Sequence, residues 1–137
     1  MSNLSGGCLC GNVRYKTDSE MLMTYRCHCR DCQRVSGTSH LSVYAVPSAA
    51  LELSGELKFY DKKGDSGNSV SLGFCPNCGS NILGKPEGSP EVVALTAGSL
   101  DDPNQYQPSM DIYTESAPSW DHLDQNTVKF SGMFSLE

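Results

Sequence analysis

The stretch Cys27-His28-Cys29-Arg30-Asp31-Cys32 carries three thiols and one imidazole within six residues. Zinc binds cysteine thiolates readily, and two cysteines separated by two residues can reach one ion from a single tight turn. Few other arrangements explain so dense a cluster of reduced thiols. The stretch therefore indicates a metal centre.

Four more cysteines flank this stretch, and the three clusters together account for all seven cysteines of the chain. Cys8 and Cys10 lie upstream, whereas Cys75 and Cys78 lie downstream in a Cys-Pro-Asn-Cys-Gly sequence. A neighbouring glycine permits a tight turn at each pair, as in a zinc knuckle. Four thiolates complete a tetrahedron, so we expect these four cysteines to bind a closed, structural zinc ion.

Seven cysteines are one short of two complete four-thiolate sites. The remaining three, Cys27, Cys29 and Cys32, would leave one position open on a second zinc ion, which is the pattern of a catalytic site. Such an ion can hold water, or it can bind and deprotonate an incoming thiol. We therefore expect two zinc ions per chain, the second of them catalytic.

Two other interpretations of the cysteines stay open. Cys75 and Cys78 could form a thioredoxin-like redox pair, although no alternating βαβ pattern surrounds them. A non-catalytic zinc module would use both metals only for folding and would bind a partner protein through its surface. A histidine or carboxylate as the fourth ligand of the second zinc would favour the module.

The positive charge is concentrated around the central cluster. Three of the four arginines, Arg26, Arg30 and Arg34, fall within nine residues. Three thiolates on one zinc ion carry a net charge of −1, which these arginines could offset. Arg30 and Arg34 would share one side of a short helix, where they could bind the carboxylates of a small anionic ligand.

The three histidines and the single tryptophan are the other side chains that could take part in a site. His28 lies between two metal-directed cysteines, so we expect its side chain to point away from the metal. His40 and His122 are isolated and are expected to be ordinary surface or satisfied histidines. Trp120 is expected to pack back onto the sheet, in the core or at the rim of a cleft.

Length and composition are those of one ordinary globular domain covering residues 1–137, with 38% hydrophobic and 19% charged residues. The net charge of −6 argues against nucleic-acid binding, which normally leaves a basic footprint. No apolar run is long enough for a membrane helix, and because the first five residues have neither a basic region nor a hydrophobic stretch, we expect no signal peptide. We therefore expect a cytoplasmic protein that keeps its thiols reduced.

Short alternating segments with glycine and proline between them predict a mainly antiparallel β domain with very little helix. One short helix is expected at 30–36, ending at Gly37. A hairpin is expected around Ser54-Gly55, between strands 51–53 and 57–60. The other expected strands are 12–17, 21–25, 40–46, 70–74, 82–83, 92–97, 112–114 and 128–130.

Three motifs occur in a fixed order along the chain. They are Gly7-Cys8-Leu9-Cys10-Gly11, then residues 27–37 (CHCRDCQRVSG), then Phe74-Cys75-Pro76-Asn77-Cys78-Gly79-Ser80. Over about residues 5–120 this sequence resembles the glutathione-dependent formaldehyde-activating enzyme (GFA) family, which shares its domain with centromere protein V.

The resemblance implies a β-tent fold of short coiled antiparallel sheets with two zinc sites. By position, Cys8, Cys10, Cys75 and Cys78 would hold the structural zinc, and Cys27, Cys29 and Cys32 the catalytic one. The implied activity is that of a carbon–sulfur lyase that condenses formaldehyde with glutathione to S-(hydroxymethyl)glutathione. Arg30 and Arg34 would then contact the thiol substrate. Where members often have a His-Ile pair, this chain has Met110-Asp111-Ile112.

Overall fold

The computed structural model describes residues 3–64 and 67–133, which form two β-sheets and one short α-helix. The helix is α1 (Arg30–Ser36), and single 3-10 turns lie at Ser48–Ala50, Ala97–Ser99, Pro103–Gln105 and Thr114–Ser116. The strands are β1 (Leu4–Gly7), β2 (Arg14–Thr17), β3 (Met23–Cys27), β4 (Leu41–Pro47), β5 (Glu52–Ser54), β6 (Lys58–Lys63), β7 (Ser69–Phe74), β8 (Asn81–Pro86), β9 (Val92–Thr96), β10 (Met110–Ile112) and β11 (Val128–Lys129). The expectation of a mainly β fold with very little helix is confirmed. No described helix has the length and apolar character needed to cross a membrane.

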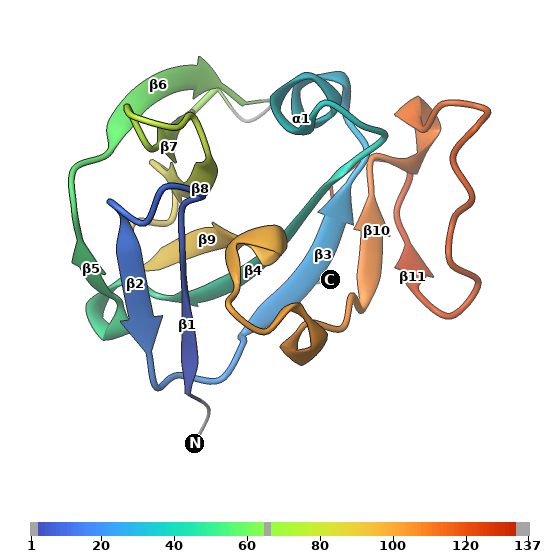
Figure 1. Ribbon diagram of the computed structural model, residues 1–137. Coiled ribbons are helices and arrows are strands. Elements are labelled where there is room, and N and C mark those ends of the chain that lie inside the picture. Colours follow the sequence, from blue (N-terminus) through green and yellow to red (C-terminus); the bar gives the residue numbers. More distant parts are fainter. Residues whose placement is uncertain (1–2, 65–66, 134–137) are drawn as a thin grey trace.

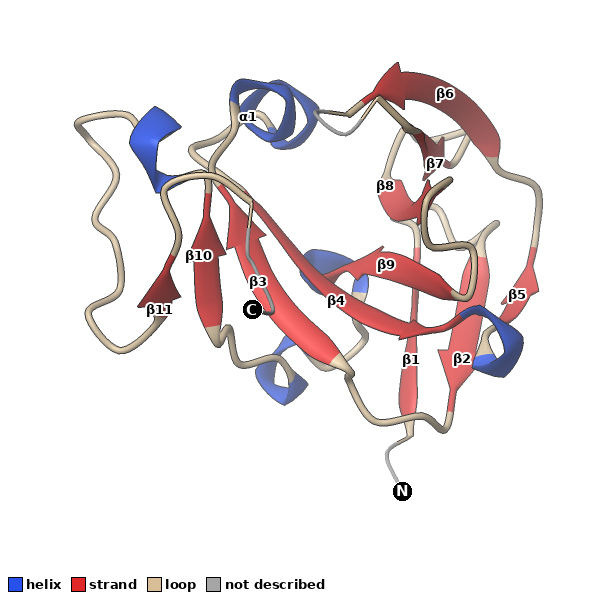
Figure 2. Cartoon of the chain, turned by 180° about the vertical axis from the view of Figure 1, so that it is seen from behind, coloured by secondary structure: helices blue, strands red, loops and turns tan. Residues whose placement is uncertain are grey.

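The larger sheet has eight strands in the order β11-β10-β3-β4-β9-β8-β7-β6, and the smaller has three in the order β1-β2-β5. Figure 1 shows the larger sheet curling from β10 and β3 through β4 and β9 toward β6, with the smaller sheet on the side away from β10 and β11. The described strand pairs are antiparallel except for those of β10, which runs parallel to both β3 and β11. Both views place α1 and β6 at the same end of the molecule (Figures 1 and 2).

The helix α1 forms where the sequence predicts it, with identical bounds. The Cys29 side chain caps its first turn by accepting the Cys32 N–H at a sulfur–nitrogen distance of 3.3 Å. Gly37 ends it in the left-handed conformation with φ of 76°, which only glycine adopts at little cost. The cap brings two of the three cysteines of the central cluster into the same turn.

The core lies between the two sheets and includes the buried side chains of Tyr44, Ile82 and Leu95. The hydroxyl of Tyr44 lies 3.0 Å from that of Tyr15, which in turn lies 2.7 Å from Ser99 Oγ. Burial raises the pKa of both tyrosines, so each stays a neutral phenol. This hydrogen-bonded chain ties β2 of the small sheet to β4 of the large one.

Two features of the fold differ from the sequence expectations. The hairpin expected around Gly55 is wrong, because β5 pairs with β2 and β6 pairs with β7, in different sheets. The sequence does not predict strand β1, because the two glycines in it are typical of a turn. A Cβ at Gly6 would lie only 2.3 Å from the Ser99 carbonyl oxygen, so glycine allows the close approach of this strand to the next layer.

Candidate metal centres

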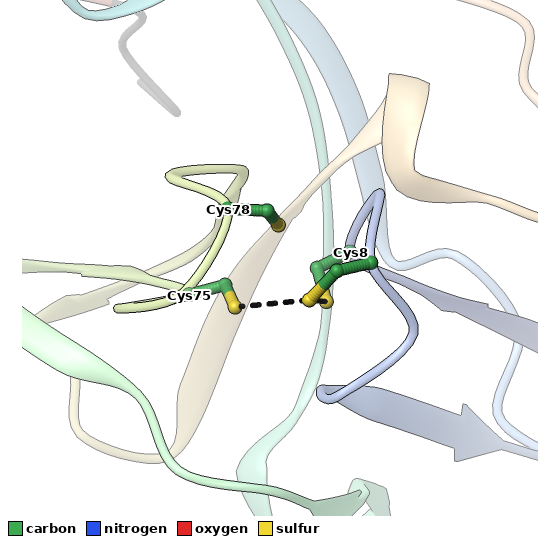
Figure 3. Close-up of side chains that lie close together, drawn as sticks. Cys8, Cys75 and Cys78 are labelled. Atoms are coloured by element: carbon green, nitrogen blue, oxygen red, sulfur yellow. Dashed lines mark hydrogen bonds between the residues drawn. The ribbon is translucent and has the colours of Figure 1, made fainter.

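The first candidate centre joins the two sheets. Cys8 and Cys10 lie in the turn after β1 of the small sheet, and Cys75 and Cys78 lie in the turn between β7 and β8 of the large one. Their four sulfur atoms lie within 4.8 Å of one another. Figure 3 shows the sulfurs of Cys8, Cys75 and Cys78 pointing into a common space. The structure thus brings together the four cysteines expected to form the closed site.

The sulfur spacing fits a tetrahedral zinc ion. The Sγ–Sγ distances are 3.6 Å between Cys8 and Cys10 and 3.8 Å between Cys10 and Cys75. Four sulfurs at the usual zinc–sulfur distance of about 2.3 Å would be about 3.8 Å apart. Gly11 and Gly79, with φ of 85° and 80°, turn the backbone just after each pair. The donor set and its geometry therefore suit zinc.

Ser80 connects the two turns of this centre. Its hydroxyl oxygen accepts the Leu9 N–H at 3.0 Å and lies 3.3 Å from Cys78 Sγ. Hydrogen bonding from Ser80 lowers the pKa of Cys78 to about 5. The Val13 N–H also points at Cys8 Sγ, at 3.2 Å. These donors favour thiolates, which are the metal-binding form of cysteine.

The second candidate centre consists of Cys27, at the end of β3, Cys29, the cap of α1, and Cys32, in its first turn. Their sulfurs also lie within 4.8 Å of one another. Hydrogen bonds from the Cys27 and Cys32 thiols lower the pKa of Cys29 to about 2, while the same contacts raise the pKa of its two neighbours. Three thiols so close together can all ionise only beside a cation. The structure thus brings together the three cysteines expected to form the open site.

The three thiols open onto a cavity of about 1020 Å³. Its walls are largely apolar and come from β4, β7 and β8, with Val43, Leu72 and Leu83 among them. Arg30 and Lys62 bring two positive charges to it. A cavity of this size is large enough for a tripeptide-sized ligand. The closed centre has no such opening, because none of its cysteines lines the cavity in the described part of the chain.

Lys62 is the cavity residue that sequence reasoning missed. It lies on β6, and its Nζ is 3.0 Å from the Asp31 carboxylate on α1, so the pair links β6 to α1 in the cavity wall. Burial alone would lower the pKa of Lys62, but Asp31, Cys29 and Cys32 outweigh it and raise the pKa. No local pattern in the sequence indicates this contact, because the two residues meet only through the curl of the sheet.

The arginines of the central cluster separate in space. Arg30 lines the cavity and donates a hydrogen bond to Gln33 Oε1. Arg34 is exposed and is not among the cavity-lining residues of the described chain, so its contact with a ligand stays a prediction. Arg26 points to the opposite face of β3, where Nε and one terminal nitrogen lie 2.9 and 3.1 Å from the two Asp111 oxygens. It does not offset the thiolate charge by contact.

Asp111 is the shared hydrogen-bond acceptor on that opposite face of β3. It is fully buried and accepts hydrogen bonds from Arg26, Thr127 and, at 2.8 Å, His28 Nε2. Burial alone would raise the pKa of Asp111, but these donors hold it at about 2. It is therefore a carboxylate at neutral pH. Asp111 lies in the stretch where members of the GFA family, which the sequence resembles, often have a His-Ile pair.

His28 points away from the three thiols, as its position between Cys27 and Cys29 predicts. Successive residues of an extended strand face opposite sides, so the imidazole joins the Asp111 face. His40, which is isolated in the sequence, lies close to His28 in the fold, with the two ring centres 5.2 Å apart. Burial lowers the pKa of His40, and the nearby charges of His28 and Arg26 act in the same direction.

The segment 120–122 agrees only in part with what the sequence predicts for Trp120 and His122. Trp120 is 62% exposed, so a place in the core is wrong. Its neighbour Asp121 instead turns inward, with Oδ2 at 2.9 Å from His28 Nδ1. His122 is exposed, as expected.

Comparisons with known proteins agree with this architecture. A crystal structure of a Rhodobacter sphaeroides protein is similar, with a TM-score of 0.58 and 22% identity over 74% of this chain and 93% of the other. That likeness concerns the fold. No curated protein matches the chain. The sequence profile of the glutathione-dependent formaldehyde-activating enzyme family matches residues 3–116, a span that includes both thiolate clusters. The chain therefore belongs to the glutathione-dependent formaldehyde-activating enzyme family.

Proposed function

We propose that this chain is a zinc-dependent enzyme of the carbon–sulfur lyase type that acts on glutathione or a related thiol adduct. The observation that carries the proposal is the opening of only three clustered thiols onto a cavity of about 1020 Å³. Zinc held by Cys27, Cys29 and Cys32 would supply a Lewis-acid position at which an incoming thiol is kept as its thiolate. Ligation requires reduced thiols, and a reducing compartment such as the cytoplasm maintains them.

The proposed reaction forms one carbon–sulfur bond. The sulfur of the thiol attacks the carbonyl carbon of formaldehyde, and the carbonyl oxygen takes up the proton that the thiol has released. The product is S-(hydroxymethyl)glutathione. The apolar walls, which include Val43, Leu72 and Leu83, would limit water around the reacting atoms.

Charged residues of the cavity would orient the substrate. Glutathione carries two carboxylates, and Arg30 and Lys62 are the cations that line the cavity. Arg34 belongs to the proposal with weaker support, since it faces solvent. The carboxylates of Asp31 and Glu115 also line the cavity, so the binding of an anionic substrate would depend on where Arg30 and Lys62 place their charges and not on an excess of positive charge.

The experiment is a calorimetric titration of zinc-loaded protein with glutathione and with mercaptoethanol, which lacks carboxylates. Lys62→Met and Arg30→Ala should each weaken the binding of glutathione by about 5- to 30-fold, equivalent to about 1–2 kcal/mol. The affinity for mercaptoethanol should stay nearly unchanged. Arg34→Ala removes the same charge outside the cavity, so it should weaken glutathione binding less than Arg30→Ala does. Equal losses for both thiols would remove the glutathione assignment.

The catalytic assignment needs its own test. Production of S-(hydroxymethyl)glutathione should depend on Cys29, so Cys29→Ser should lose activity while keeping the closed zinc. Wild-type protein that carries zinc but neither binds thiols nor accelerates this condensation would instead fit a non-catalytic zinc module.

A further inference from the structure

The face of β3 opposite the thiolate cluster carries a second group of potential ligands that the proposed reaction does not use. It consists of His28, His40 and Asp121, whose ligand atoms lie within 4.8 Å of one another. They come from the β3–α1 junction, from the residue before β4 and from the segment between β10 and β11. Residues distant in sequence therefore converge on one point.

The environment of His28 leaves one ring nitrogen available. Nε2 lies 2.8 Å from the Asp111 carboxylate, to which it donates in one of the two tautomers of the ring. In that tautomer Nδ1, the ring atom facing Asp121, is free to bind a metal ion. A carboxylate that fixes the tautomer of a histidine in this way is the usual outer partner of a metal-binding histidine.

The Asp121 carboxylate is placed poorly for a hydrogen bond to His28 but well for binding one metal ion together with it. His28 Nδ1 and Asp121 Oδ2 are 2.9 Å apart, yet they are not aligned for a hydrogen bond, and neither atom has another such partner among the described residues. Both atoms are buried, and the His28 side chain is only 1% exposed. Leaving buried polar atoms unpaired costs free energy, so an ion bound between them would stabilise this arrangement.

Bond lengths explain this geometry. Nitrogen and oxygen ligands lie about 2.0–2.2 Å from a zinc ion. Two ligand atoms 2.9 Å apart would then subtend an angle of about 90° at the metal. Such an angle belongs to five- or six-coordinate ions, with further positions filled by water. In the same arrangement the oxygen lies off the direction of the nitrogen lone pair, as observed.

His40 completes the set. Its ring lies against that of His28 at an interplanar angle of 50°, and its Nδ1 is 3.0 Å from Ser39 Oγ. When this hydroxyl accepts the Nδ1 proton, Nε2 carries the remaining lone pair. We propose that His28, His40 and Asp121 bind a third metal ion, a divalent first-row transition ion held without thiolates. Two imidazoles and one carboxylate are a donor set that such ions accept, Fe²⁺ and Zn²⁺ among them.

The test counts bound zinc after equilibrium dialysis of the full chain under reducing conditions. We expect one equivalent less per chain in His40→Ala and in Asp121→Asn than in the wild type. His122→Ala is the matched control, because His122 is exposed and adjacent to Asp121, and it should bind as much zinc as the wild type. The comparison is a difference between variants, so it does not depend on the proposed reaction or on how fully the thiolate centres are occupied.

A second measurement identifies the ligands. In a Co²⁺ titration the thiolate centres should add intense sulfur-to-cobalt charge-transfer absorption, whereas the equivalent lost in Asp121→Asn should add only weak ligand-field bands. Circular dichroism confirms that each variant is folded. Equal zinc content in the wild type and both variants, or loss of a charge-transfer band with the missing equivalent, would overturn the proposal. The first result would leave His28 and Asp121 as an ion pair only.

Discussion

Asp111→Asn should destabilise the protein by about 3–5 kcal/mol at pH 7. Asp111 is fully buried and accepts hydrogen bonds from both Arg26 nitrogens, His28 and Thr127. The amide keeps one acceptor oxygen but turns an NH₂ group toward these donors and leaves the Arg26 charge with only the more distant Asp124 carboxylate, at 3.9 Å. Removing one partner of a buried ion pair typically costs about 3–5 kcal/mol, because the other charge stays buried.

The effect can be converted into a melting temperature. An unfolding entropy of about 2.1 cal/mol/K per residue gives about 0.29 kcal/mol/K for 137 residues. A loss of 3–5 kcal/mol should therefore lower Tm by about 10–17 °C. A typical domain has about 5–15 kcal/mol in total, so the variant should still fold at room temperature.

The assay is thermal and urea unfolding followed by circular dichroism. All proteins are measured at one zinc concentration, because bound metal adds to apparent stability. Asp124→Asn is the control: that carboxylate is 3.9 Å from Arg26 and its Oδ1 accepts the Asn126 N–H, a bond that asparagine retains. We expect it to cost less than about 1 kcal/mol. If Asp111→Asn lay within 1 kcal/mol of this control, the reasoning about the buried carboxylate would be refuted.

Three further outcomes are expected. Tyr15→Phe should cost about 1–3 kcal/mol in urea unfolding, because the buried Tyr44 hydroxyl loses the partner that the structure describes for it, whereas Tyr44→Phe should cost only about 0.5–1.5 kcal/mol; equal losses would contradict this order. Leu95→Ala should cost about 2–5 kcal/mol, since its fully buried side chain leaves a cavity in the core, and a loss under 1 kcal/mol would contradict that packing. Cys75→Ser should lower Tm far more than Cys29→Ser, because its centre joins the two sheets; similar losses would remove the distinction between the centres.

Local signals in the sequence are enough for several parts of the molecule. The helix bounds follow from Gly37, whose left-handed backbone ends α1. The pairing of Cys8 and Cys10 with Cys75 and Cys78 follows from counting thiols, since a tetrahedral site needs four. The opposite orientation of His28 follows from the alternation of an extended chain.

Contacts that depend on the curl of the sheets have no such signal. Asp111 and His28 are 83 residues apart, and neither neighbourhood indicates the other. Lys62 reaches the thiolate cluster only because β6 lies at the far edge of a sheet that bends back over α1. The departure from a His-Ile pair marks Asp111 as unusual, but its role as a shared acceptor is visible only in the folded chain.

At the end of β3, the tripeptide Cys27-His28-Cys29 directs its side chains to alternate faces, the thiols toward the cavity and the imidazole toward Asp111. Because neighbouring side chains face opposite ways, a one-residue deletion within 23–27 would shift the register of the strand and send the imidazole toward the cavity and a thiol toward Asp111. The two faces would be disrupted together. Apart from Arg26, His28 and the two cysteines, the side chains here should therefore tolerate replacement much better than the segment tolerates a change in length, and homologues are expected to keep this spacing.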